Sequence, residues 1–230
     1  MRPLIVAIDG PAGAGKSTVS KLLARRLGLS FVDSGALYRT VALSARRQGI
    51  ATDDDPALAA LVGRIRISFK ATGDDNRVYL DGEDVSKEIR TPEISLLASA
   101  VSARPVVRAG LLDLQRRLAL EAPVGAVLEG RDIGTVVFPD ADLKFFLEAS
   151  PDVRARRRYE ELFQKGTESS LDAVLADQTK RDRNDASRAV APLKPADDAV
   201  RVDSSGLPLS EVVQRLERVI HERLSARGGA

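Results

Sequence analysis

The chain has 230 residues, of which 43% are hydrophobic, and its 35 Lys and Arg residues nearly balance 33 Asp and Glu residues. This length and apolar content suit one α/β domain with a full core, with room for a small insert. The absence of cysteine excludes disulfides and thiolate metal sites, and the single histidine excludes His-rich metal sites and disfavours a Ser-His triad. The net charge of +2 requires neither nucleic acid nor an anionic membrane as a partner.

The sequence lacks the signals of membrane insertion or export. No apolar run approaches the roughly 20 residues that span a bilayer, and the first residues lack the pattern of a signal peptide. We therefore expect a cytoplasmic protein with no membrane partner. No long exposed apolar seam is visible, so we also expect a monomer.

Short apolar runs alternate with helical patterns along the chain, which is typical of a parallel sheet flanked by helices. Five buried strands are predicted at residues 3–9, 30–33, 125–129, 143–147 and 199–203. Helices are predicted at residues 16–27, 35–48, 56–63, 92–100, 106–121, 151–165, 171–187 and 209–226. Thr91-Pro92 and Ser150-Pro151 each place a capping hydroxyl before a proline at the first helical position.

Residues 64–86 break this alternation. Ile65, Ile67 and Phe69 alternate with polar side chains, which predicts a half-exposed antiparallel strand. A turn is expected at residues 72–76, and Asp81-Gly82 is typical of a tight hairpin turn. We therefore expect a small antiparallel insert within a single domain whose core comprises residues 1–63 and 87–230.

A glycine-rich motif directly follows the first predicted strand. Gly10 to Ser17 read GPAGAGKS, which is the pattern G-x-x-x-x-G-K-[ST] between a strand and a helix. Glycines allow backbone N–H groups to surround an anion, and the following helix adds its positive end. Lys16 can reach the β- and γ-phosphates, and the Ser17 hydroxyl can bind a magnesium ion. The motif predicts a site for a nucleoside triphosphate.

This motif also occurs in GTPase switches and in motor ATPases. Residues 179–182 and 203–206 imitate two GTPase motifs, but the first lies in a predicted helix and the second comes too late in the chain. Glu129, at the end of a predicted strand, could supply the acidic residue of a motor ATPase, for which the chain is small.

Arginines after successive predicted strands favour a kinase instead. Arg39 follows the second strand, Arg131 the third, and a cluster at residues 154–158 the fourth. Ligands bind at the carboxyl ends of parallel strands, and a guanidinium grips two phosphate oxygens at once. Phosphoryl transfer between two anionic nucleotides requires several cations around the transferred group.

Three segments resemble the bacterial cytidylate kinase family, namely DSGALYR at residues 33–39, GRDIGTVVFP at residues 130–139 and RAVAPL at residues 188–193. The resemblance covers nearly the whole chain in the correct order. It implies a P-loop nucleoside monophosphate kinase fold whose monophosphate-binding region carries the antiparallel insert, and a lid at about residues 150–190. It also implies magnesium-dependent phosphorylation of CMP and dCMP by ATP.

The resemblance also implies roles for individual residues. The ATP phosphates would be held by the loop and the helix start after it, at Gly10, Pro11, Ala12, Gly13, Ala14, Gly15, Lys16, Ser17 and Thr18, with Arg157 among the lid arginines. CMP would be bound by Ser34, Arg39, Ser99, Arg108, Arg131, Asp132, Arg181, Asp185 and Arg188. Catalysis would depend on Lys16, Arg131 and Arg188, with Ser17 as a magnesium ligand.

Within that set, Ser99, Arg108 and Asp132 would read the cytosine, and Asp185 would bind the ribose. A carboxylate accepts from the cytosine amino group and a guanidinium donates to its acceptors, whereas uracil reverses part of this pattern. Ordinary structural roles remain open for Asp132 as a cap or partner of Arg131, and for Ser99 and Asp185 as helix-surface residues. A P-loop kinase for another nucleotide or metabolite, or a nucleotide-dependent switch, also remains an alternative.

Overall fold

The computed structural model describes residues 2–72, 75–164 and 166–228. It divides into two compact units, one formed by Met1–Val32 with Ala119–Ala230 and the other by Asp33–Leu118. Each unit has a hydrophobic cluster of its own. The first is called the phosphate-loop unit, because it contains the glycine-rich loop at residues 10–17 (the phosphate loop), and the second is called the helical unit.

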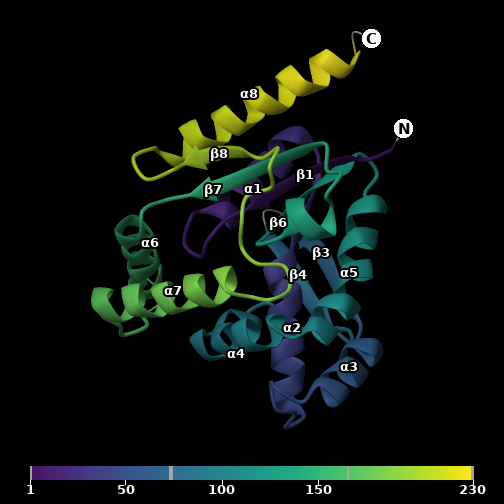
Figure 1. Cartoon of the computed structure of the whole chain (residues 1–230), viewed down its shortest axis with the longest axis vertical. Helices are drawn as coiled ribbons and strands as arrows, with labels where there is room; N and C mark the ends of the chain where they lie inside the picture. Colours follow the sequence, from purple (N-terminus) through teal and green to yellow (C-terminus); the bar gives the residue numbers. More distant parts are fainter. Residues whose placement is uncertain (1, 73–74, 165, 229–230) are drawn as a thin grey trace. The chain divides into compact units, whose positions relative to one another are not determined.

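A five-stranded sheet forms the centre of the phosphate-loop unit (Figure 1). Its order is β2 (Ser30–Asp33), β6 (Gly125–Gly130), β1 (Leu4–Asp9), β7 (Leu143–Glu148) and β8 (Val200–Asp203). Strand β1 pairs in parallel with β6 and β7, and β7 with β8, so their carboxyl ends lie at one edge. The predicted five-stranded parallel sheet is confirmed.

Helices α1 (Lys16–Leu27) and α8 (Leu209–Gly228) pack against each other and onto this sheet. Val19, Leu23 and Leu216 are buried there against strand residues such as Ile8, because apolar residues recur at helical spacing on one face of each helix. Helices α6 (Pro151–Gln164) and α7 (Leu171–Ala186) follow β7 and pack against each other. A short π-helical turn, η2 (Ile133–Val137), follows β6.

The helical unit is built from α2 (Ser34–Arg47), α3 (Asp55–Arg64), α4 (Pro92–Ser102) and most of α5 (Pro105–Leu120). Its small sheet has the order β3 (Ile67–Thr72), β4 (Asp75–Leu80) and β5 (Glu83–Asp84), and a 3-10 turn, η1 (Glu88–Arg90), follows. Both pairs of strands are antiparallel. The core is apolar and includes Leu37, Val41, Leu58, Leu61 and Leu111.

The predicted insert is present as an antiparallel sheet. Asp81 and Gly82 have φ values of 50° and 92° between paired Leu80 and Glu83, as a two-residue hairpin turn requires. The expected turn at residues 72–76 includes residues 73–74, which lie outside the described residues. The sequence pattern gives no bounds for the strand after this turn, β5, because its two exposed residues carry no alternating pattern.

Local chemistry explains where the helices begin. The Thr91 hydroxyl accepts a hydrogen bond from the Ile94 amide at 3.3 Å, and the Ser150 hydroxyl accepts one from the Val153 amide at 3.4 Å. Both predicted caps are therefore confirmed. The predicted helices agree with the observed ones to within two residues at each end. Among the described residues no single helix is long and apolar enough to cross a bilayer; α4 and α5 meet that criterion only as a pair bent by 99°.

Candidate functional site

The glycine-rich loop lies between β1 and α1, at the carboxyl edge of the sheet. Gly10, Gly13 and Gly15 have φ values of 148°, 77° and 87°, which residues other than glycine rarely adopt. A Cβ atom on Gly10 would lie 1.9 Å from the Leu147 carbonyl oxygen, so the loop also packs too closely for a side chain there. The sequence pattern therefore forms the strand-loop-helix structure that was predicted for it.

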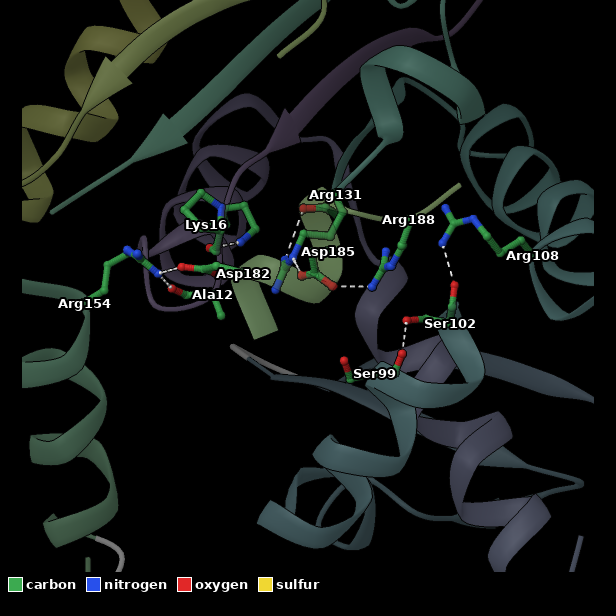
Figure 2. Close-up of polar contacts among 12 residues, drawn as sticks. Ala12, Lys16, Ser99, Ser102, Arg108, Arg131, Arg154, Asp182, Asp185 and Arg188 are labelled. Carbon is green, nitrogen blue, oxygen red and sulfur yellow. Dashed lines mark hydrogen bonds and ion pairs between the residues drawn. The ribbon is translucent and has the colours of Figure 1, made fainter. Parts of the chain in front are cut away.

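Lys16 begins α1 and is buried. Its Nζ donates a hydrogen bond to the Pro11 carbonyl oxygen at 2.7 Å, across the loop (Figure 2). Burial lowers the pKa of the Lys16 ammonium to about 7, and the neighbouring Arg131 acts in the same direction, while Glu129 and Asp9 oppose it. Burial therefore disfavours the charged form of Lys16 while no anion is near, and an incoming phosphate would favour the ammonium and interact strongly with it in this dry environment.

Two oxygen-bearing side chains meet beside the loop. The Ser17 hydroxyl donates a hydrogen bond to Glu129 Oε1 at 2.6 Å, joining α1 to the end of β6. Glu129 is buried, whereas Ser17 and the following Thr18 are exposed. A hydroxyl and a carboxylate are the hard oxygen donors that Mg²⁺ prefers, so this pair fits a magnesium site.

Helix α6 is attached to the loop by a buried arginine. Arg154 donates hydrogen bonds to the carbonyl oxygens of Ala12 at 2.9 Å and Ala149 at 3.0 Å, and it forms an ion pair with Asp182 of α7 at 2.6 Å (Figure 2). A Cβ atom on Gly13 would lie 2.7 Å from Nε2 of Gln178, also on α7. The backbone of the phosphate loop is therefore packed against both helices.

Arg157, one turn further along α6, binds a different segment. Its guanidinium donates to the Ser204 hydroxyl at 3.1 Å and to the Ser204 carbonyl oxygen at 2.7 Å, just after β8. Its Nη1 atom would lie 3.9 Å from a Cβ atom on Gly15. Arg157 therefore lies beside the phosphate loop.

Two of the predicted arginines share one carboxylate. Asp185, near the end of α7, is buried and accepts a hydrogen bond from Arg131 Nε at 2.7 Å; Arg188 forms an ion pair with its other oxygen (Figure 2). Residues from the end of β6 and the end of α7 are thus brought together, 54 positions apart in the chain. The carboxylate holds both guanidinium groups in place, since an ion pair with little exposure to water is screened only weakly.

Arg181 lies on the same helix. Its Nε atom is buried and has no hydrogen-bond partner within residues 2–72, 75–164 and 166–228. Burial lowers the pKa of Arg181, and the nearby Arg158 adds to this effect. A buried donor without an acceptor is costly, so an anionic or oxygen-rich ligand at this place would be stabilised.

The segment after β6 contains Arg131 and Asp132, followed by η2. Asp132 is buried, and its carbonyl oxygen accepts from the amides of Val136 at 2.9 Å and Val137 at 3.2 Å. Asp9, the last residue of β1, accepts from the amides of Ile133 at 2.9 Å and Gly134 at 2.8 Å. Burial raises the pKa of the Asp9 carboxyl to about 6, against the opposing effect of these two amides.

The remaining predicted residues belong to the helical unit. Asp33 caps α2 through the Ala36 amide at 2.8 Å and pairs with Arg39 at 2.9 Å, and Ser34 between them is buried. A Cβ atom on Gly35 would lie 3.1 Å from Nη1 of Arg39, so glycine leaves space for this guanidinium. The start of α2 therefore presents a fixed cation beside a hydroxyl.

Arg108 of α5 is buried in the same unit. Its Nη1 donates to the Ser102 carbonyl oxygen at 3.1 Å, and its guanidinium lies 5.4 Å from the centre of the Tyr38 ring. The Ser102 hydroxyl in turn donates to the Ser99 carbonyl oxygen at 3.0 Å (Figure 2). Arg108, at the start of α5, thus lies next to the last turn of α4 and against Tyr38 of α2.

Two contacts were not anticipated from the sequence. Asp9 was interpreted only as the end of a strand, although a carboxylate at the carboxyl edge of a buried strand is itself a signal of a site. Arg154 was interpreted only as a member of the lid arginines, and no sequence pattern identifies the one arginine of residues 154–158 that is buried against the loop.

Comparison with known proteins identifies the family of this chain. The model of the family described as cytidylate kinase matches residues 6–222. A cytidylate kinase of Geobacter sulfurreducens is 57% identical over 229 residues, covering 100% of this chain and 97% of that protein. Cytidylate kinases of Geobacter sp. (strain M21) and Mycobacterium leprae are 54% and 49% identical, covering 96% and 98% of this chain and 94% and 99% of those proteins. The chain belongs to the cytidylate kinase family.

Proposed function

We propose that this protein transfers the γ-phosphoryl group of ATP directly to CMP or dCMP, giving ADP and CDP or dCDP. The observation that carries the proposal is the group of charges at the carboxyl edge of the sheet. Lys16 ends the phosphate loop, Arg131 is close enough to lower the Lys16 pKa, and Asp185 holds Arg131 and Arg188 together. Such a set of fixed cations offsets the repulsion between two anionic nucleotides.

The ATP side of the proposal rests on Gly10 to Thr18. Their backbone amides surround the phosphates, and Lys16 exchanges its bond to Pro11 for the β- and γ-phosphate oxygens. Arg157, beside the loop, binds ATP as the lid closes. Ser17, with Glu129 beside it, would hold Mg²⁺. When bound, the ion neutralises charge on the β- and γ-phosphate oxygens.

The CMP side of the proposal rests on the residues that the family resemblance assigns to it. Arg131, Arg188 and Arg39 bind the acceptor phosphate, with Ser34. Asp185 and Arg181 bind the ribose. Asp132 accepts from the cytosine amino group, Arg108 donates to the acceptors of the base, and Ser99 also contacts the base. A uracil carbonyl would face Asp132 acceptor to acceptor, which costs about 1–3 kcal/mol for the buried group and favours CMP over UMP.

No strong general base is needed, since the attacking phosphate oxygen already carries negative charge. The protein's contribution is alignment of the two nucleotides, fixed positive charge around the transferring group, and exclusion of water that would otherwise hydrolyse ATP. The transfer therefore proceeds in line, without a phosphorylated enzyme.

The proposal includes the setting in which the protein acts. The chain itself supplies the residues for both nucleotides, so a monomer suffices, and neither nucleic acid nor a membrane takes part. ATP and CMP are cytoplasmic metabolites, so the protein acts in the cytoplasm. A solution mass near 24.7 kDa would support the monomer, and twice that value would contradict it.

An acceptor panel tests the function. ADP release is measured with CMP, dCMP, UMP, AMP, GMP or no acceptor. We expect turnover with CMP and dCMP and almost none without an acceptor. Lys16→Ala and Arg131→Ala should each lower turnover about 10²-fold or more, because each removes charge that acts on the transferring group. Preference for another acceptor would indicate a different kinase, and ADP release without any acceptor would indicate an NTPase. Near-normal turnover of Arg131→Ala with CMP would contradict the assigned site.

A further inference from the structure

Asp9 contacts both ends of a short segment that contains two of the proposed CMP-binding residues. Its backbone pairs with Gly130 at the end of β6, and its carboxylate accepts from the amides of Ile133 at 2.9 Å and Gly134 at 2.8 Å. Arg131 and Asp132 lie between these anchors. We call residues 130–134 the reader turn.

We propose that Asp9 is a positioning residue that holds the reader turn, and with it the Asp132 carboxylate, in the geometry that selects cytosine over uracil. This inference rests on the proposed function. Asp9 is the residue directly before the phosphate loop, so it also joins the reader turn to the strand that carries the ATP-binding loop.

The contacts leave Asp132 little freedom. Its carbonyl oxygen is held by the amides of Val136 and Val137, and the next two amides along the chain are held by Asp9. A carboxylate can accept both of those amides, one on each oxygen, whereas a neutral carboxamide offers only one acceptor atom. Loss of one acceptor would leave a buried N–H group unsatisfied and allow the turn to shift.

The surroundings of Asp9 disfavour its charged form. It is buried with 5% of its surface exposed, and the nearby Asp132 repels its negative charge while Lys16 attracts it. A neutral residue would avoid both the desolvation and the repulsion. The two hydrogen bonds from amides of the reader turn favour the charged form and offset part of this cost.

Asp9→Asn tests this inference, with Asp142→Asn as the matched control. Asp142 is also a buried carboxylate at the edge of the same sheet, and it accepts from the Ile5 amide at 2.8 Å, but it lies at the amino end of β7. Both variants lose one buried acceptor. Asp9→Asn should lower the ratio of kcat/KM for CMP to kcat/KM for UMP about tenfold, which corresponds to about 1.4 kcal/mol. Asp142→Asn should leave that ratio unchanged.

Three further measurements distinguish a positioning role of Asp9 from a nonspecific loss of structure or activity. The KM for CMP should rise in Asp9→Asn more than the KM for ATP; an equal rise would show that Asp9 acts on the phosphate loop and would overturn the proposal. In a double-mutant cycle with Asp132→Asn, the two losses of CMP preference should be less than additive, because one residue acts through the other. Full additivity would also overturn it. Amide exchange in the peptide covering residues 131–138 should accelerate in Asp9→Asn and not in Asp142→Asn.

The failure of this inference is distinguishable from failure of the proposed function. If the unaltered protein does not phosphorylate CMP, the proposed function is wrong. If it does, and Asp9→Asn keeps the same CMP-to-UMP ratio, only the role of Asp9 is wrong. Should Asp9→Asn fail to fold, Asp9→Ser, which also keeps a single acceptor, is measured in the same way and carries the same expected loss.

Discussion

Asp9 illustrates how a single buried charge connects stability with function. Its carboxylate holds two backbone amides, and burial raises its pKa from 3.8 to about 6. A raised pKa means that the folded protein binds a proton more tightly than the unfolded chain does. The ionised form therefore lowers stability, and this cost is fully present above the folded-state pKa. Residues kept at such a cost are commonly found at functional sites.

The pH dependence of unfolding should show this cost. Between pH 3.8 and about 6, the folded protein takes up more protons at Asp9 than the unfolded chain, so its contribution to stability falls as pH rises. Relative to Asp9→Asn, the unaltered protein should lose about 2 kcal/mol of unfolding free energy between pH 4 and pH 7, which is most of the roughly 3 kcal/mol that the whole shift represents at 1.36 kcal/mol per pKa unit. Urea unfolding of both proteins across this range measures the difference. A difference that stays constant or grows with pH would contradict the raised pKa.

At the scale of elements, the phosphate loop is held by the two helices that follow β7. Arg154 of α6 binds the Ala12 carbonyl oxygen, and Gln178 of α7 donates to the Arg154 carbonyl oxygen at 3.3 Å. A Cβ atom on Gly13 would lie 2.7 Å from Gln178 Nε2 and 3.0 Å from Arg154 Cβ. Because Arg154 binds a backbone atom of the loop and Gln178 lies against Gly13, a shift of α6 or α7 would alter the positions of the amides that are proposed to hold the ATP phosphates.

Gly13→Ala tests this packing, with Gly28→Ala as its control. Both glycines have positive φ, 77° and 65°, but a Cβ atom on Gly28 meets nothing within 4 Å, whereas one on Gly13 meets Gln178 and Arg154. Gly28→Ala should cost about 1 kcal/mol through backbone strain alone. Gly13→Ala should cost more and should also weaken ATP binding about tenfold or more, measured by urea unfolding and calorimetric titration. Equal effects of the two variants on ATP binding would contradict the proposed packing.

At the scale of the whole molecule, the chain builds two separate cores. The cluster of the phosphate-loop unit gathers the sheet with α1 and α8, and the cluster of the helical unit gathers α2 to α5 with the small sheet. The proposed ATP residues belong to the first unit, while Ser34, Arg39, Ser99 and Arg108 belong to the second. Regions with separate cores commonly open independently in hydrogen exchange.

Matched core truncations test that independence. Leu61 of the helical unit and Leu216 of the phosphate-loop unit are both fully buried. Each change to alanine should cost about 2–5 kcal/mol, from lost apolar burial and the cavity that is left. Leu61→Ala should accelerate exchange within residues 33–118 and leave ATP affinity within about twofold, since the ATP residues lie in the other unit. Leu216→Ala should accelerate exchange in the sheet instead. The same acceleration in both units from either variant would show a single cooperative unit.

Sequence reasoning determined the features that depend on short stretches of chain. Strand and helix positions follow from apolar periodicity and capping residues, and the phosphate loop follows from glycines whose backbone angles other residues avoid. The antiparallel insert was also recognisable, because alternation over Ile65, Ile67 and Phe69 is a local pattern.

Only the tertiary structure decided which distant charges meet. Asp185 could have been a solvated residue of a charged helix, but the fold buries it between Arg131 and Arg188. Asp9 could have been an ordinary strand end, but the pairing of β1 with β6 brings it under the amides of Ile133 and Gly134. The contact of Arg131 with Asp185 and the contacts of Asp9 with Ile133 and Gly134 join residues more than 50 positions apart, and no local periodicity records them. They depend on strand order and helix packing, which the whole core sets.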